Sequence, residues 1–429
     1  MKENNIQERV GVNSKYNPSR SLISKIFNKL SCFGWNIATC IINIFVHRNN
    51  AIVLIGAWGG SKFADNSRFL YQYLFHNKKE LGLKKVIWVT RSNKVYDELS
   101  RVGYESYVCG TRESRYYHLK AGIHVICNSA AYGFLMPDID TKYSYGAKKI
   151  QLWHGVGFKA VGPASNKEIN KIEKQDFKRK YARFYQIFTY GGWISAFFLS
   201  TSEKNAEAIY RISETPKGKI FISGYPRNCE CIRLLPEEEK VIEKIKKYPG
   251  AILYLPTFRE TSSYVHPLEY DSVCKLIKDN GWLWIEKPHS ADTDREKFKE
   301  RDCDILELDS DFDINVIYRY IKGLVSDYSS AVFDGAYKGI PTVMYTPDID
   351  EFKSGSIGFL FDVESYCKSL ICKDEQTLYE DIKQIILGSY LNQERSETLY
   401  KIRRDYFDDR DSSYEDIWND ILKVISKNH

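Results

Sequence analysis

Four short stretches of the sequence carry side chains that could bind and transfer a phosphate group. They are Trp153-His154-Gly155, Thr257-Phe258-Arg259, Lys287-Pro288-His289 and Ser326-Asp327-Tyr328-Ser329-Ser330. Each comes directly after a short apolar run that is typical of a buried strand. Ligands of open parallel sheets collect at the carboxyl ends of the strands, so the four stretches are predicted to line one site.

The residue types in these stretches suit displacement at phosphorus by a hydroxyl group. His154 titrates near neutral pH, so we predict that it is the general base that accepts the hydroxyl proton. The guanidinium of Arg259 can bind two phosphate oxygens at once. Lys287 and His289 stand two residues apart at one strand end, so both can face the same ligand. A packed structural histidine and a surface ion pair are the alternatives for His154 and Arg259.

Two serines, Ser329 and Ser330, lie between a predicted strand and the helix that is predicted to follow it. Free N–H groups and the positive dipole end of a helix attract anions, and two hydroxyls there can donate to phosphate oxygens. An ordinary N-cap and turn is the alternative. Asp334 lies one turn into the predicted helix and faces the same way, whereas Asp327 could orient His289 or bind a ribose.

Together and in this order, the four stretches resemble the signature of the CDP-glycerol:poly(glycerophosphate) glycerophosphotransferases. These are the teichoic-acid and capsule polyol-phosphate transferases. The resemblance runs from about Ala51 to about Phe361. Further matching stretches are Ala64-Asp65-Asn66, Leu199-Ser200-Thr201-Ser202, Gly224-Tyr225-Pro226-Arg227 and Gly339-Ile340-Pro341.

The resemblance implies a transferase that moves glycerol-phosphate or ribitol-phosphate from a CDP-alcohol and releases CMP. The implied acceptor is a hydroxyl of a teichoic-acid-like or capsular polyol-phosphate or glycan polymer, or of its lipid-linked primer. It further implies donor binding by Asp334, for which a core or capping role is the alternative. His154 and His289 are the predicted catalytic residues. The predicted substrate-binding residues are Trp153, Gly155, Thr257, Arg259, Lys287, Ser326, Asp327, Ser329, Ser330 and Asp334.

Strands that alternate with helices predict an α/β fold with parallel sheets. We expect a GT-B-like architecture, in which two Rossmann-type domains face a cleft and an amphipathic helix precedes them. The predicted parts are a tail and amphipathic helix over residues 1–48, an acceptor domain over 49–228, a CDP-donor domain over 229–395, and a bracing C-terminal helix over 396–429.

Two segments outside these motifs could contact a membrane or a polymer. Apolar residues follow helical spacing from Ser21 to Val46, which predicts a helix that either docks on the first domain or lies in a membrane interface. The stretch from Lys159 to Arg183 is rich in basic residues. It is either a solvated face or a surface for anionic lipid or a polyphosphate chain, carried by Lys171, Lys174, Lys178 and Arg179.

Composition and motifs indicate the partners, the cellular location and the cofactors to expect. The net charge of +6 is modest and no nucleic-acid-binding motif is present, so we expect no nucleic-acid partner. Ten scattered cysteines give no disulfide framework, and neither a signal peptide nor a membrane span is predicted. We therefore expect a cytoplasmic protein, peripheral on the inner face of the cell membrane. We expect no cofactor and no metal, because Asp309-Ser310-Asp311-Phe312-Asp313 reads as a solvated turn.

Two other functions remain open from the sequence. One is a GT-B glycosyltransferase that uses a nucleotide sugar, and the other is a non-catalytic protein that binds polymer or membrane. The sequence also departs from the family pattern at two places beside the predicted acceptor. It has Val156-Gly157-Phe158-Lys159 where the family usually has Thr-x-x-Lys, and Ser290 where proline is common.

Overall fold

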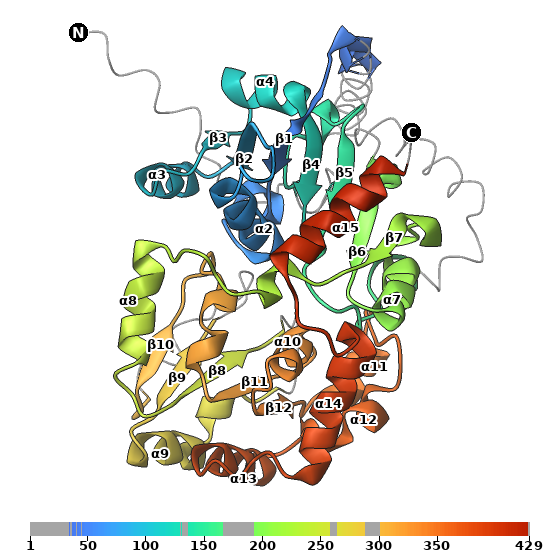
Figure 1. The fold of residues 1–429 in the computed structure, drawn as a ribbon. Helices are drawn as coiled ribbons and strands as arrows, with labels where there is room; N and C mark the ends of the chain where they lie inside the picture. Colours follow the sequence, from blue (N-terminus) through green and yellow to red (C-terminus); the bar gives the residue numbers. More distant parts are fainter. Residues whose placement is uncertain are drawn as a thin grey trace, which may run out of the picture.

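Two parallel sheets, stacked one above the other in Figure 1, organise the protein. The computed structural model describes residues 34, 37–39, 41–43, 45–128, 130, 136–165, 193–257, 264–287 and 301–427. Both sheets belong to the expected α/β class, so the predicted fold of two Rossmann-type domains is confirmed.

The first sheet has seven strands in the order β3-β2-β1-β4-β5-β6-β7, and all of its pairings are parallel. Its inner strands are buried on both faces, which explains why they read as continuous apolar runs rather than alternating ones. The strands are β1 (Asn49–Ile55), β2 (Lys85–Thr90), β3 (Ser106–Val108), β4 (Ala121–Ile126), β5 (Lys148–Gln151), β6 (Phe197–Ser200) and β7 (Ile220–Ile222).

Among the described residues, four helices lie in the segments that connect these strands. Side-chain caps begin three of them, because Ser92, Thr111 and Ser202 each accept a hydrogen bond from the N–H group three residues later. The helices are α2 (Asp65–His76), α3 (Asn93–Arg101), α4 (Arg112–Lys120) and α7 (Glu203–Ser213).

The second sheet has six parallel strands in the order β10-β9-β8-β11-β12-β13. In chain order this is the 3-2-1-4-5-6 arrangement of a dinucleotide-binding fold, so its topological switch point lies between β8 and β11. The strands are β8 (Ala251–Leu255), β9 (Leu283–Glu286), β10 (Ile305–Glu307), β11 (Gly323–Ser326), β12 (Thr342–Tyr345) and β13 (Ile371–Cys372). The helices are α8 (Pro236–Ile245), α9 (Asp271–Asp279), α10 (Ala331–Tyr337), α11 (Ile349–Ser354), α12 (Val363–Tyr366) and α13 (Glu375–Ile386).

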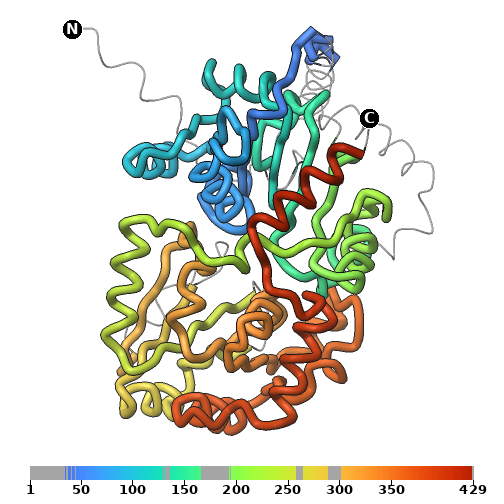
Figure 2. The backbone as a smooth tube through the Cα atoms, in the orientation of Figure 1, coloured from blue at the N-terminus to red at the C-terminus, as the bar shows by residue number. Residues whose placement is uncertain are grey.

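The C-terminal segment returns to the first sheet, as the red end of the trace shows in Figure 2. The sequence predicts one bracing helix over residues 396–429, but the structure has two helices in this region, α14 (Gln393–Phe407) and α15 (Tyr414–Ser426). The helix breaks because Asp408 and Asp409 adopt left-handed backbone angles, with φ of 52° and 49°. The Tyr414 ring of α15 stacks on Tyr73 of α2, with 5.0 Å between the ring centroids.

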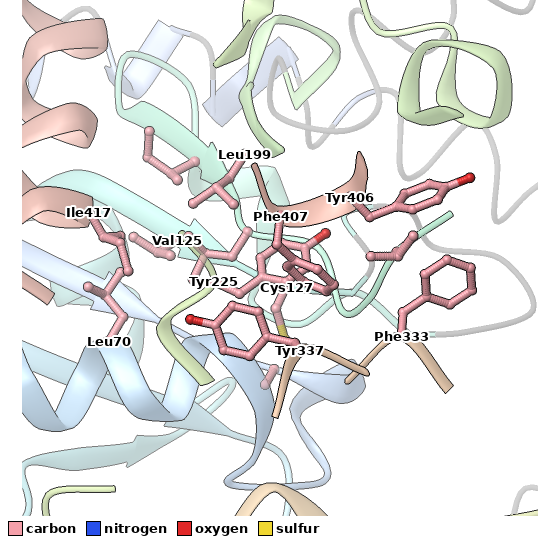
Figure 3. Close-up of a cluster of buried hydrophobic side chains, with 14 of the residues drawn as sticks. Leu70, Val125, Cys127, Leu199, Tyr225, Phe333, Tyr337, Tyr406, Phe407 and Ile417 are labelled. Atoms are coloured by element: carbon pink, nitrogen blue, oxygen red, sulfur yellow. The ribbon is translucent and has the colours of Figure 1, made fainter. Parts of the chain in front are cut away.

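One hydrophobic cluster joins the two halves of the protein (Figure 3). Val125 and Leu199 from the first sheet share it with Phe333 and Tyr337 of α10, and with Ile417 of α15. Because these side chains are buried together, the helix that follows the paired serines is packed against the core of the opposite domain.

Short helical segments lie near β11 and β12. Two three-residue 3₁₀ turns, Ile314–Val316 and Tyr318–Tyr320, precede β11, and Asp348 is the N-cap residue of α11 after β12. No helix in the described ranges is both long enough and apolar enough to span a bilayer.

Candidate active site

The carboxyl ends of the two sheets carry the predicted motifs. Trp153 comes two residues after β5 of the first sheet, and Thr257 comes two residues after β8 of the second. Asp327 follows β11 directly, so it lies with Thr257 at the switch point of the second sheet. The expected placement of the motifs at strand ends is therefore observed for these three stretches.

The His154 imidazole has a defined tautomer. Its Nδ1 lies 3.2 Å from the Cys127 carbonyl oxygen, and a carbonyl can only accept, so Nδ1 carries the proton. Nε2 is left as the ring nitrogen that can accept a proton. The ring lies between two indoles, with centroid distances of 4.2 Å to Trp153 and 5.5 Å to Trp58.

The electrostatic surroundings of His154 keep it neutral. Burial lowers the pKa of His154 from its usual value, and the nearby charges of Arg227 and Lys159 lower it further. Asp65 and the hydrogen bond to the Cys127 carbonyl oppose this shift without reversing it. A neutral imidazole at neutral pH is the form that a general base needs.

Three side chains hold the backbone of the Trp153-His154-Gly155 turn. Each carbonyl of the turn accepts a hydrogen bond from a different residue. The donors are Asn66 Nδ2 to Trp153 at 2.8 Å, an Arg227 guanidinium nitrogen to His154 at 2.8 Å, and the Tyr225 hydroxyl to Gly155 at 3.0 Å. Residues of other segments therefore hold the backbone of this turn, and a fixed backbone restricts the direction of the imidazole.

Left-handed backbone conformations gather around this turn. Trp58, Asp65 and Trp153 have φ of 47°, 65° and 59°, which residues with a Cβ rarely adopt. Such strain persists only where surrounding contacts compensate for it, and it is often found at functional sites. Here the compensating contacts include Asn66, whose side chain binds the Trp153 carbonyl.

The histidine turn touches the serine turn of the opposite domain. A Cβ atom built on Gly155 would lie 2.5 Å from the Ser330 Oγ and 2.8 Å from its Cβ. Ser329 and Ser330 are half-buried, and Ser329 Oγ accepts from the Ala331 N–H. Helix α10 has only seven residues, so its dipole is small. We therefore expect an anion to be bound by the hydroxyl and N–H groups of this turn rather than by the helix dipole.

Thr257 and Asp327 are linked at the switch point. Both carboxylate oxygens of Asp327 lie 3.0 Å from the Thr257 backbone nitrogen and accept its hydrogen. Lys159, from the first domain, donates to the Thr257 hydroxyl at 3.5 Å. Lys159, which ends the Val156-Gly157-Phe158-Lys159 stretch, therefore contacts the second domain.

Lys287 lies beside a second lysine. The Lys287 ammonium donates to the Phe312 carbonyl at 2.6 Å, and Lys62 of the first domain donates to the Ser310 carbonyl at 2.6 Å. Burial lowers the pKa of Lys287 to about 8, and the positive charge of Lys62 adds to this effect. Lys62 also lines a cavity of about 840 Å³ between the two domains.

The segment from Asp309 to Asp313 is only in part the solvated turn that its composition predicts, since Asp309 is exposed. Asp313, in contrast, is buried and accepts a hydrogen bond from the Asp65 backbone nitrogen at 3.0 Å, while Asp311 pairs with Lys94 at 2.8 Å. These contacts with the first domain are not revealed by composition alone.

Two predicted substrate-binding residues are engaged inside the protein. Ser326 is fully buried and donates to the Leu255 carbonyl at 2.7 Å, and Asp334 is buried against Arg227. Both side chains thus already have partners within the protein, and their contact with the donor stays a prediction. Six predicted residues lie outside the described residues: Arg259, His289, Lys171, Lys174, Lys178 and Arg179.

One group of described side chains has metal-ligand spacing, namely Cys109, His118 and Asp140. The histidine nitrogens are both engaged, since Nδ1 donates to the Ser114 carbonyl at 2.7 Å and Nε2 accepts from the Asp140 backbone nitrogen at 3.0 Å. The Asp140 carboxylate pairs with Arg91 at 2.9 Å. These contacts account for the cluster as a structural network of the first domain.

Several residues of the site escape single-sequence reasoning. Asn66, Tyr225 and Arg227 lie in stretches that match the family, yet no spacing or motif connects them with His154, whose turn they contact. Trp58 lies in a glycine-rich loop that follows β1. Its contact with the imidazole arises because β1 and β5, which are separated by β4, end at the same edge of the parallel sheet.

Two bacterial sequences and one solved structure are similar to this chain. Over 84% of this chain and 90% of its own length, a teichoic acid poly(glycerol phosphate) polymerase of Bacillus spizizenii is 24% identical. A teichoic acid glycerol-phosphate transferase of Staphylococcus aureus is 22% identical over 79% of this chain and 84% of its length. The solved wall teichoic acid polymerase TagF superposes with a TM-score of 0.67 at 16% identity, covering 95% of this chain and 98% of that one.

The family comparison spans nearly the whole protein. Residues 39–423 match the family described as CDP-glycerol:poly(glycerophosphate) glycerophosphotransferase. This range contains both sheets and every described residue of the candidate site. The chain therefore belongs to the CDP-glycerol:poly(glycerophosphate) glycerophosphotransferase family.

Proposed function

We propose that this protein transfers a glycerol-phosphate or ribitol-phosphate unit from a CDP-alcohol to a hydroxyl of a teichoic-acid-like or capsular polymer, with release of CMP. The observation that carries the proposal is the contact between the Gly155 and Ser330 turns. The contact supports the proposal because the residue that follows His154 lies against the turn that carries the hydroxyls of Ser329 and Ser330. A proton acceptor next to a phosphate-binding turn is what phosphoryl transfer to a hydroxyl requires.

The proposed reaction is a displacement at the phosphorus that carries the polyol. His154 Nε2 accepts the proton of the acceptor hydroxyl, and the hydroxyl oxygen forms the new bond to phosphorus. The bond between that phosphorus and the bridging oxygen of the diphosphate breaks, so CMP leaves with both bonding electrons. The product is a phosphodiester, and the imidazolium returns its proton to solvent.

Cations and hydroxyls on both domains would neutralise the charge that develops. Lys159 and Lys287 approach the site from the first and second domain respectively, and Ser329 and Ser330 add hydroxyls. Asp327 orients Thr257 rather than facing an anion directly. We assign Arg259 and His289, which lie outside the described residues, to the diphosphate on the strength of the family motifs.

The division of labour between the domains follows from this arrangement. We propose that residues 49–228 form the acceptor domain and 229–395 the CDP-donor domain, because the switch point of the second sheet is the place where such folds bind nucleotides. Residues 396–429 would brace the two, in line with the stacking of α15 on α2 and the hydrogen bond from Arg403 of α14 to the Tyr337 carbonyl of α10.

We further propose that the protein works at the inner face of the membrane, where a lipid-linked acceptor would be presented. The helical residues that precede β1 expose large apolar side chains at four-residue spacing: Ile37 is 42% exposed, Ile41 53% and Phe45 77%. Such a stripe suits insertion into a membrane interface. Arg48 anchors the end of this segment through hydrogen bonds to four backbone carbonyls of the first domain.

A donor panel tests the proposed function. CDP-glycerol, CDP-ribitol and several nucleotide sugars would be supplied with a polyol-phosphate acceptor, and CMP, nucleoside diphosphate and new phosphodiesters would be measured. We expect CMP and a phosphodiester with at least one CDP-alcohol. Release of a nucleoside diphosphate with formation of a glycoside would favour the nucleotide-sugar transferase instead, and no turnover with any donor would favour the non-catalytic reading.

A further inference from the structure

We propose that Arg227 is a positioning residue that fixes the turn of His154 against helix α10, so that one guanidinium joins the turn of the base to the turn proposed to bind phosphate. The proposal rests on the assignment of His154 as the general base. Arg227 lies in the short turn η6 (Pro226–Asn228), where the chain leaves the first domain for the second. The sequence motifs gave it no task of its own.

On the side of the first domain, Arg227 makes three hydrogen bonds around the histidine turn. One guanidinium nitrogen donates to the His154 carbonyl at 2.8 Å and to Asp65 Oδ1 at 3.1 Å. The backbone N–H of Arg227 donates to Asn66 Oδ1 at 3.1 Å, and the amide nitrogen of Asn66 donates in turn to the Trp153 carbonyl. Arg227 therefore supports two consecutive peptide groups of the turn, one directly and one through Asn66.

On the side of the second domain, the other terminal nitrogen binds α10. It lies 2.7 Å and 2.9 Å from the two carboxylate oxygens of Asp334. Asp334 is in the same helix that begins after Ser330, and the Asp334 N–H donates to the Ser330 carbonyl at 3.2 Å. The guanidinium is thus a rigid connection between the carbonyl of the base and the turn proposed to bind phosphate.

The chemistry of the connection requires arginine. The side chain is 4% exposed and joins two buried carboxylates, Asp65 and Asp334. Burial alone would lower the pKa of Arg227, but the two carboxylates outweigh burial and raise it above its usual value. A planar fork can serve the Asp65, Asp334 and carbonyl acceptors together, whereas the compact ammonium of lysine cannot span them.

A second buried arginine provides a control inside the same protein. Arg68 of α2 is fully buried and pairs across the domains with Glu238 of α8, as Arg227 does with Asp334. No hydrogen bond of Arg68 reaches the histidine turn among the described residues. Loss of Arg68 should therefore weaken the domain interface while leaving His154 in place.

The test compares Arg227→Gln, Arg227→Lys and Arg68→Gln, with Asp334→Asn as a milder variant of the same connection. Two quantities are measured: the turnover rate, and the titration of His154 followed by NMR of protein with labelled histidine. The charged groups that act on the imidazole are Asp65, Arg227 and Lys159. Removing Arg227 takes away one of the two positive charges that oppose Asp65, so the pKa of His154 should rise.

For Arg227→Gln we expect turnover to fall about 10- to 100-fold, as for displaced catalytic groups, and the His154 titration to move to higher pH. Arg227→Lys keeps the charge, so its titration should stay near that of the wild type while turnover remains low. Asp334→Asn keeps the contacts of Arg227 to Asp65 and His154, so its turnover should fall less than that of Arg227→Gln. Arg68→Gln should lower the melting temperature and leave both quantities unchanged.

The proposal is overturned if His154 titrates in Arg227→Gln as it does in the wild type, or if Arg68→Gln shifts it equally. Should Arg227→Gln not fold, Arg227→Lys and Asp334→Asn decide: full turnover in both contradicts the positioning role. The NMR readout does not depend on activity. If the His154 titration shifts in Arg227→Gln but His154→Ala retains full turnover, the assignment of His154 as the base is refuted. The inference that Arg227 positions the histidine turn would still hold.

Discussion

Gly155 of the first domain and Ser330 of the second are in such close contact that a single added methyl group would not fit between them. A Cβ on Gly155 would come within 2.5 Å of the Ser330 hydroxyl oxygen, well inside van der Waals contact. Since Gly155 follows His154 and Ser330 precedes α10, this contact sets the distance between the proposed base and the proposed phosphate-binding turn.

Gly155→Ala should therefore push the two turns apart. We expect turnover to fall by about 10- to 100-fold, because small displacements of reacting groups are costly. Gly157→Ala is the matched control, since a Cβ there would lie 3.4 Å from its nearest neighbours, Ala208 and Ile212. Steady-state rates of the two variants at equal folded fractions check this, and equal activity of both would argue against a fixed spacing.

The rate should depend on pH in a bell shape. Burial lowers the pKa of His154 below its usual value of about 6.5, so the base becomes protonated and the rate falls only in acid solution. Lys287 loses its charge above its pKa of about 8, which should weaken donor binding as the pH rises. Lys287→Arg stays charged and should remove the alkaline limb. An alkaline limb that persists in this variant would assign it to another group.

The apolar stripe before β1 should carry membrane binding. Ile41→Asp and Phe45→Asp together should reduce sedimentation with anionic phosphatidylglycerol vesicles several-fold, because charged side chains enter the interface poorly. Leu387→Asp, an equally drastic change at a 68% exposed position of the second domain, is the control. Truncation is a poorer test, since Arg48 is bonded to the first domain. Unchanged sedimentation of the double variant would place the contact elsewhere.

Catalysis should not require a metal ion. The proposal assigns charge neutralisation to lysine, arginine, histidine and hydroxyl groups, with Lys159 and Lys287 among those described. Turnover should therefore survive exhaustive treatment with EDTA. If activity disappeared and magnesium restored it, a metal would have to be added to the mechanism.

The sequence was a good guide to local structure and to the family. Strands such as Ala51–Ile55 and Ala251–Leu255 are continuous apolar runs because both faces of each sheet are covered, and such runs can be read without a structure. The histidine and serine turns could be placed at strand ends for the same reason. Their direct contact agrees with the prediction that the two halves meet at one site.

Contacts between distant segments could not be read in this way. The carboxylates from Asp309 to Asp313 look solvated by composition, yet Asp313 is buried at the domain interface. Likewise, nothing in the spacing of Arg227 indicates that it bonds with residues 73 positions earlier and 107 positions later. Such pairings depend on how the two domains close, which is a property of the whole fold.

The most direct test of the proposed chemistry is a comparison of His154→Ala with the wild-type protein in two measurements. Turnover is followed by CMP release from the CDP-alcohol that the donor panel identifies, and donor affinity is followed by calorimetry. We predict that turnover falls by about a hundredfold or more, in line with general-base catalysis, while the donor dissociation constant changes little. Turnover at the wild-type rate would contradict the assignment of His154 as the base.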